Sequence, residues 1–140
     1  MELKEMSVFP IGKTNDMYAK YFVGQSYLNM LSTEQVVVGN VTFEPKCRNN
    51  WHIHHADKGG GQILIVTAGE GWYQEWGKKP IALKPGSVVN IPANVKHWHG
   101  ATKDSWFQHL AIEVPGENCK NEWCEPVSDY DYENLEREFE

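Results

Sequence analysis

The sequence predicts an all-β protein, folded as a sandwich or a barrel. Its middle part consists of short segments rich in β-branched and aromatic residues, which favour extended backbone. Turn sequences such as DKGGG, AGEG and KPG separate these segments at even intervals, a spacing that favours a sandwich or barrel over alternating strands and helices. The predicted strands are residues 35–45, 50–54, 62–68, 71–76, 87–92 and 105–114.

Two of the predicted strands contain apolar runs that do not alternate with polar residues. Residues 36–38 are VVV and residues 63–66 are ILIV. A strand with one face in water should alternate, so both strands are expected to be covered on both faces. The second cover is either the N-terminal segment or another subunit, and we therefore predict a homodimer.

The two ends of the chain differ from its middle. Residues 17–31 mix Gly, polar and aromatic residues with no helical or strand period, so residues 1–34 are predicted to form an irregular N-terminal arm. In the tail, residues 115–140, Ser128 or Asp129 can cap a short helix that has acidic residues in its first turn. The barrel is assigned to approximately residues 35–114, within a single domain of residues 1–140.

Charge and cysteine content limit the partners and the compartment. A net charge of −6 disfavours nucleic acid, which needs a basic surface. No apolar run is long enough to span a bilayer, and the start MELKEMSVFPIGK does not read as a signal peptide. The three cysteines form no familiar zinc pair and are expected to be buried or free thiols. We therefore expect a cytoplasmic protein that binds neither nucleic acid nor membrane.

The histidines carry the strongest functional signal. Successive side chains on a strand point to opposite faces, so His52 and His54 share one face, and so do His97 and His99. Two imidazoles at this spacing can bind one metal ion. Packing alone is a poor explanation for two such pairs in a sheet interior, because each ring brings polar nitrogens that need partners. The sequence therefore predicts a metal site.

Two motifs that contain these histidines resemble the motifs of the cupins, which are small metal-binding β-barrels. The first motif is His-x-His followed by a carboxylate or Gln and then a Gly. The second is Gly, five residues, Pro and then His. Asn94 stands where the family commonly has Gly, and Ala101 stands where it usually has Asn. The matching residues are His52, His54, Gln62, Gly69 and Gly71 in the first motif and Gly86, Pro92 and His97 in the second.

The segments VTFEP, WHIH, QILIVTAGEGW, KHWHGAT and HLAI are similar to a subgroup of single-domain bacterial cupins that includes the manganese-dependent hydroxynitrile lyases. The resemblance implies a cupin-type double-stranded β-helix, or jelly-roll barrel, and manganese or iron as the metal. Nickel, cobalt and zinc also accept imidazole and oxygen ligands. The loop HADKGGG is longer than in the subgroup, so His55 or Asp57 is an alternative fourth ligand. The implied ligands are His52, His54, Gln62 and His97.

The same resemblance places His99 and His109 in the cavity without a bond to the metal. A neutral histidine near a dication is hard to protonate, so either ring is expected to act first as a base. A buried, hydrogen-bonded structural role is the alternative for His109. The candidate residues of the substrate pocket are Trp51, Val41, Phe107 and Glu113, although packing is the stronger interpretation of Trp51.

Neutral ligands leave the full charge on a divalent ion, which favours polarising a bound oxygen of a small organic substrate. The expected reaction is cleavage of a C–C bond, as in the hydroxynitrile lyases that the chain resembles. Two alternatives remain open. One is an Fe(II)-dependent cupin dioxygenase, and the other is a non-catalytic cupin that binds or senses a small ligand.

Overall fold

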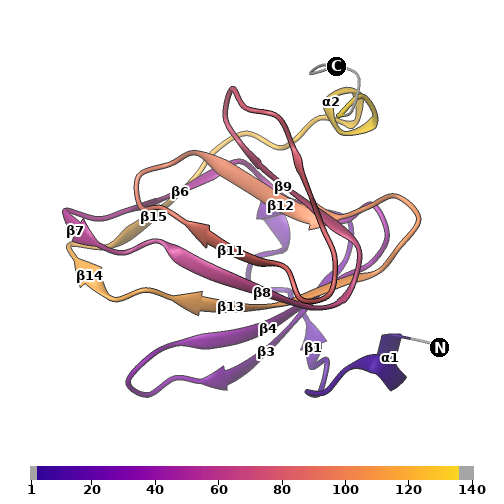
Figure 1. Ribbon diagram of the computed structural model, residues 1–140, viewed down its shortest axis with the longest axis horizontal. Coiled ribbons are helices and arrows are strands. Elements are labelled where there is room, and N and C mark those ends of the chain that lie inside the picture. The colour runs from indigo at the N-terminus through magenta and orange to yellow at the C-terminus, as the bar shows by residue number, and fades with distance from the viewer. Residues whose placement is uncertain (1–2, 136–140) are drawn as a thin grey trace.

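The computed structural model describes residues 3–135, which fold into two facing β-sheets (Figure 1). The first sheet has the strand order β1-β3-β4-β13-β8-β11. Its strands are β1 (Lys13–Thr14), β3 (Ser26–Ser32), β4 (Val38–Phe43), β13 (Phe107–Glu113), β8 (Gln62–Gly69) and β11 (Val88–Ile91). All of its pairings are antiparallel, as expected for an all-β jelly roll.

The second sheet has the order β10-β9-β12-β5-β2, and β6 pairs with both β12 and β15. Its strands are β10 (Ile81–Leu83), β9 (Gly71–Glu75), β12 (His97–Ala101), β5 (Arg48–Asn49), β2 (Phe22–Val23), β6 (His52–His55) and β15 (Lys120–Trp123). The helices are α1 (Leu3–Met6), a 3-10 helix (Ala19–Tyr21) and α2 (Asp129–Glu133). None of the helices in residues 3–135 is long and apolar enough to cross a membrane.

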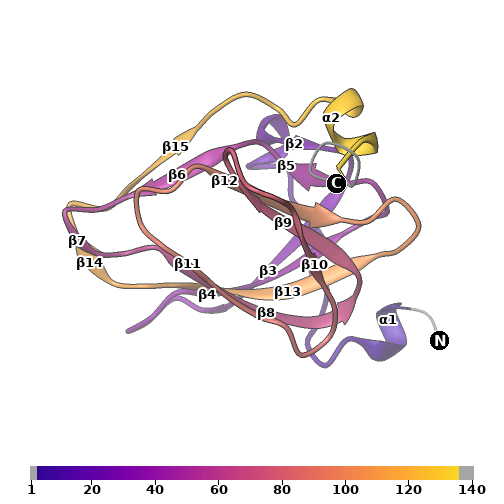
Figure 2. The same cartoon turned by 45° about the horizontal axis from the view of Figure 1, so that its top comes forward.

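The main core lies between the two sheets (Figure 2). Phe43, Leu64, Val66 and Phe107 from the first sheet pack with Tyr73 and other residues of the second sheet. Burial along β8 alternates between buried and half-buried positions, so one face of the strand points into the core. The predicted all-β, cupin-type fold is confirmed.

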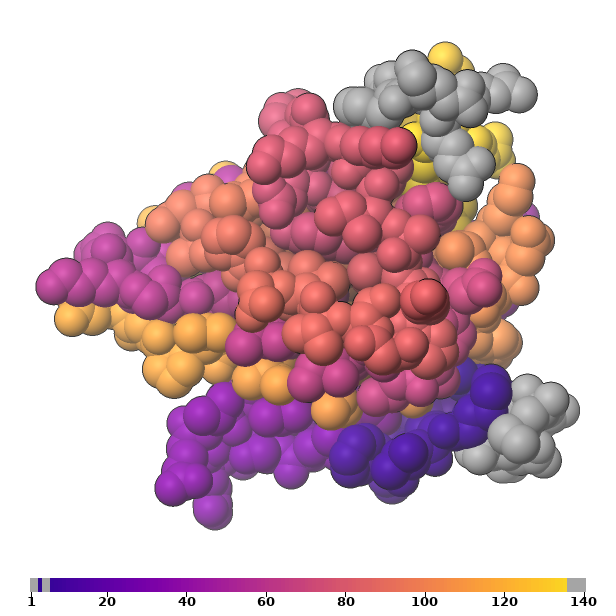
Figure 3. Space-filling model, viewed as in Figure 1, coloured from indigo at the N-terminus to yellow at the C-terminus, as the bar shows by residue number. Residues whose placement is uncertain are grey.

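The N-terminal arm covers part of the outer face of the first sheet (Figure 3). The side chain of Gln108 donates to Ser7 Oγ at 2.8 Å, and the side chain of Asn40 donates to the carbonyl of Pro10 at 3.1 Å. Both amides are almost completely buried on a face that would otherwise be wet. The arm therefore covers this face at Asn40 and Gln108, whereas Val37 in the first apolar run is exposed and Ile63 and Ile65 in the second are half-buried.

The C-terminal tail covers the outer face of the second sheet. Arg48 donates to the carbonyl of Val127 at 2.7 Å and to Asp129 at 2.8 Å, and Tyr132 donates to the carbonyl of Ala101 at 2.7 Å. Ser128 caps α2 by accepting a hydrogen bond from the amide of Asp131, which confirms the predicted cap. Trp51, Trp98, Val127, Tyr132 and Leu135 form a second core cluster under this tail.

The long loop before β8 turns sharply on its glycines. Gly59, Gly60 and Gly61 all have positive φ, and a Cβ on Gly61 would lie 2.3 Å from the carbonyl oxygen of Ile91. The loop also forms a short ribbon in which β7 (Lys58–Gly59) pairs with β14 (Gly116–Glu117). The additional residues of this long loop thereby form part of a ribbon, and β8 begins at Gln62.

Candidate metal centre

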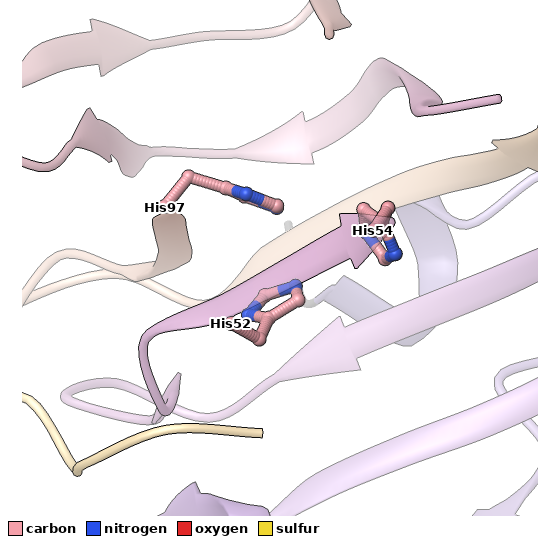
Figure 4. A group of neighbouring side chains, drawn as sticks. All are labelled: His52, His54 and His97. Carbon is pink, nitrogen blue, oxygen red and sulfur yellow. The ribbon is translucent and has the colours of Figure 1, made fainter. Parts of the chain in front are cut away.

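Three histidines from two neighbouring strands meet inside the barrel (Figure 4). His52 and His54 lie on the buried face of β6, and His97 of β12 pairs directly with His52. One ring nitrogen from each residue lies within 4.8 Å of the other two, a separation that a single metal ion can bridge. The strand alternation that predicted a shared face for His52 and His54 therefore also aims them at His97.

Each of the three rings has its Nδ1 held by an oxygen. The acceptors are the carbonyl of Asn50 for His52 at 2.8 Å, the carbonyl of Val95 for His97 at 2.9 Å, and Asn121 Oδ1 for His54 at 2.8 Å. An oxygen of this kind can only accept, so each Nδ1 carries the proton and each Nε2 presents a lone pair. Nε2 of His54 and of His97 is buried with no partner among the described residues. This arrangement is typical of histidines that bind metal.

Burial favours the neutral form of His52 and His97, and metal binding requires neutral imidazoles. Burial lowers the pKa of His97 to about 4, and burial together with the neighbouring His97 lowers the pKa of His52 well below its usual value. His52 and His97 can therefore bind a divalent transition metal at neutral pH without first losing a proton.

The structure places Gln62 at the start of β8, buried and opposite Glu113 in the β8–β13 register. Its amide nitrogen donates to Glu113 Oε1 at 2.6 Å. This bond occupies the amide nitrogen and leaves the amide oxygen as the atom that can bind a cation.

His55 and Asp57, the alternative fourth ligands, are paired elsewhere. His55 Nε2 contacts Glu122 Oε1 at 2.7 Å, and Asp57 accepts from Asn118 at 2.7 Å. Both contacts are exposed, and neither residue belongs to the cluster of the three histidines.

His99 and His109 form a second pair of buried rings beside this cluster. Their ring centroids are 4.8 Å apart, and the ring of His99 lies 5.8 Å from that of His52. The amide of Asn49 contacts the ring of His99, whereas both nitrogens of His109 are buried and have no hydrogen-bond partner among residues 3–135. Burial lowers the pKa of both rings, to about 4 for His109. Both are therefore neutral imidazoles at neutral pH.

A pocket of about 320 Å³ opens beside His54, and its described wall contains neither His52 nor His97, His99 or His109. His54, Glu113 and Asn121 form part of its wall, together with apolar residues that include Val36 and Val114. Of the four residues predicted to line a substrate pocket, Glu113 lies in this wall.

The other three pocket candidates lie elsewhere. Val41 and Phe107 pack in the main core, where the ring of Phe107 lies 5.5 Å from that of His109. Trp51 packs in the second core cluster and against Trp76. Its role in a substrate pocket stays a prediction.

Comparison with known proteins agrees with this architecture. A family model described as a cupin domain matches residues 39–112, and the chain belongs to the cupin family. It is 37% identical over 136 residues to an (R)-mandelonitrile lyase of Granulicella tundricola, a match that covers 94% of this chain and 98% of the relative.

Solved structures are similar over nearly the whole chain. A cupin-like protein of Thermotoga maritima is 37% identical, with a TM-score of 0.82 and coverage of 94% of this chain and 98% of that one. A double-stranded β-helix protein of Klebsiella pneumoniae has the same fold at 17% identity, with a TM-score of 0.61 and coverage of 89% and 96%.

The site also contains two residues that the sequence did not indicate. Asn121 and Trp123 belong to β15, which pairs with β6 and places them opposite His54 and His52. Asn121 is 67 positions from His54 in the chain, and no local pattern connects the two. Only the pairing of a C-terminal strand with the histidine strand brings them together.

Proposed function

We propose that this protein is a metal-dependent enzyme that cleaves a C–C bond in a small hydroxynitrile. The observation that carries the proposal is the cluster of three imidazoles, each with its Nδ1 bonded to an oxygen and each with one ring nitrogen within 4.8 Å of the other two. The similarity to a protein named (R)-mandelonitrile lyase, over almost the whole chain, supports the reaction class.

The proposed ligands are His52, His54, His97 and the amide oxygen of Gln62, and the proposed metal is manganese or iron. All four ligands are neutral, so a bound dication would retain its charge and polarise a substrate oxygen. Glu113 would hold the amide of Gln62 in the orientation that presents oxygen rather than nitrogen.

His109 is proposed as the base that takes the hydroxyl proton of the substrate, with His99 beside it as the second acid–base group. Burial keeps His109 unprotonated at neutral pH, so one ring nitrogen has a lone pair available. As the proton leaves the hydroxyl oxygen, the carbonyl forms, the C–C bond breaks, and cyanide departs with the electron pair of that bond.

The pocket favours a small neutral substrate. Its volume of about 320 Å³ lies at the small end of ligand sites, and its walls combine valines with the carboxylate of Glu113. Among the described residues, Glu113 forms no ion pair that would neutralise it. A substrate carboxylate would therefore be repelled, whereas a cyanohydrin carries no charge.

The decisive experiment is reconstitution of the purified protein with Mn(II) or Fe(II), followed by an assay of aldehyde release from (R)-mandelonitrile. The wild-type protein should bind one metal ion and turn over, and His97→Ala should lose both properties. Full activity in metal-free His97→Ala protein would refute the proposal. Turnover of another substrate that stops without O₂ would instead favour a dioxygenase, and ligand binding without any turnover would favour a sensor.

We also propose that the protein is a homodimer. The outer face of β8 is only half-buried by the described residues at Ile63 and Ile65, and the same face contains half-buried Leu110 and Ile112. Next to Ile65, Val88 is 58% exposed. A second copy of the chain would cover this apolar area, which the N-terminal arm leaves open.

The free cysteines favour a reducing compartment, and we propose the cytoplasm. Cys47, Cys119 and Cys124 are all unpaired, and Cys119 is exposed. An exposed free thiol is uncommon in proteins from oxidising compartments.

A further inference from the structure

We propose that β15 positions the metal ligands of β6, and that Asn121 is the residue that fixes the ring of His54. This inference rests on the metal centre proposed above. The strand lies at residues 120–123, outside the segment 39–112 that matches the cupin family model. Its contribution therefore lies outside the segment that defines the family match.

The contact between Asn121 and His54 is direct. The two residues are paired in the β6–β15 register, and Asn121 Oδ1 accepts from His54 Nδ1 at 2.8 Å. His54 is 93% buried, with a relative exposure of 7%, and its Nε2 has no partner. With the proton held at Nδ1, the lone pair at Nε2 points into the cluster.

Asn121 differs in kind from the acceptors of the other two ligands. His52 and His97 donate to backbone carbonyls, those of Asn50 and Val95, and no side-chain substitution removes them. The orientation of His54 depends on a side chain. Among the three ligands, His54 is therefore the one whose tautomer a single substitution can release.

Trp123 supports the neighbouring ligand by packing. It lies opposite His52 in the same register, and its ring centroid is 4.7 Å from that of His52. The indole also stacks on Tyr21, at 4.5 Å and an interplanar angle of 4°. One strand therefore contacts two of the three imidazoles, His54 through Asn121 and His52 through Trp123.

The strand also offers an internal control. Glu122 lies between Asn121 and Trp123 and points to the opposite face, where it contacts His55 at 2.7 Å. Glu122→Gln therefore alters a histidine contact on the same strand without touching the metal cluster.

The test is titration of the purified, metal-free protein with Mn(II), with the free ion followed by electron paramagnetic resonance. Asn121→Leu keeps the approximate volume and removes the acceptor. It should weaken Mn(II) binding by about 10–100-fold. Asn121→Asp retains an acceptor and should stay within a few-fold of wild type, and Glu122→Gln should match wild type. Equal affinity of Asn121→Leu and wild type, or equal losses in Asn121→Leu and Asn121→Asp, would overturn the proposal.

A second readout separates this inference from the metal centre itself. Long-range ¹H–¹⁵N spectra of the metal-free protein report which nitrogen of His54 carries the proton. Wild type should show the proton at Nδ1, and Asn121→Leu should show a mixture of tautomers, whereas Glu122→Gln should be unchanged. If wild type binds no Mn(II), the proposed function fails, and these spectra still decide the role of Asn121. An unchanged His54 tautomer in Asn121→Leu would refute that role.

Discussion

The two ring nitrogens of His109 have no hydrogen-bond partner in the part of the chain that the structure describes. The residue is completely buried, and the rings of Phe43, Phe107 and His99 surround it at centroid distances of 4.8–5.5 Å. A buried polar group without a partner costs about 1–3 kcal/mol, so an apolar residue would serve packing better. The cost is understandable if a substrate supplies the missing partner, as the proposed base requires.

The burial of His109 predicts a specific dependence of stability on pH. Burial lowers its pKa from the ordinary value of 6.5 to about 4 in the folded protein, so below pH 6.5 the unfolded chain binds the proton more strongly. This stabilising contribution is complete above pH 6.5 and is lost as the pH falls toward 4. Between pH 7 and 5 the metal-free protein should lose about 2 kcal/mol from this residue.

Urea unfolding of wild type and His109→Leu at the two pH values measures that contribution. The variant should lose about 2 kcal/mol less than wild type over the same interval. The other buried histidines are common to both proteins, and among them His99 contacts His109, which helps to lower the pKa of His99. Parallel losses in the two proteins would contradict the assignment of a low pKa to His109.

At the scale of single residues, strand alternation and backbone preferences predicted much of the metal site. Strand alternation predicted that His52 and His54 would share a face, and the positive φ of 70° at Asn94 agrees with the tolerance of Asn for that conformation. Asn121 could not be predicted, because its role depends on which strand pairs with β6. Such a pairing is set by the whole fold, whereas alternation is a property of the strand itself.

Among the elements, the turn between β8 and β9 depends on Gly69. Its φ is +72°, and a Cβ at this position would lie 1.8 Å from the carbonyl oxygen of Trp106. Gly77 has nearly the same φ, +77°, but nothing lies within 4 Å of its added Cβ. The two glycines therefore separate the cost of the backbone conformation from the cost of a steric clash.

Alanine substitutions at these two positions should differ in their effects on stability. Gly77→Ala should cost about 1–2 kcal/mol, which is the strain of a left-handed conformation with a side chain. Gly69→Ala should cost about 1–3 kcal/mol more, because the carbonyl of Trp106 must move. Midpoints of urea unfolding measure both. Equal destabilisation of the two variants would show that the β8–β9 turn relaxes freely.

The strands that sequence patterns predicted well are those with strong composition and clear alternation. The predicted segment 62–68 agrees with β8 to within one residue, and 71–76 agrees equally well with β9. In contrast, β3 lies in a segment without a regular period, because most of its residues are only half-buried and either face tolerates mixed side chains. β15 was missed because it is exposed and polar and is held mainly by pairing with β6.

At the scale of the whole molecule, each sheet needs a cover over its outer face. The C-terminal tail covers the second sheet, and the N-terminal arm covers only part of the first. The apolar runs predicted covered strands, but they could not predict which cover each strand receives. That outcome depends on where the chain ends pack after the barrel has formed.

The proposed dimer predicts that the mass in solution is twice that of the chain at micromolar concentration. Val88→Glu places a charge at an exposed position of the uncovered face and should shift the protein toward monomer, because burying an unpaired charge is costly. Ile81→Glu is the matched control, since Ile81 is 54% exposed but belongs to the second sheet. Sedimentation analysis distinguishes the species, and a monomeric wild-type protein would rule out the dimer.

The contact from Asn121 to His54 has a consequence for how relatives of this protein are compared. Two chains can share every barrel motif, including all three histidines, and still differ at the strand that follows the barrel. If that strand fixes the orientation of one metal ligand, sequence identity within the barrel would not predict the metal affinity of a homologue. An alignment intended to transfer metal affinity should therefore extend through residue 123, and swapping residues 120–123 between two such homologues would exchange part of their affinities.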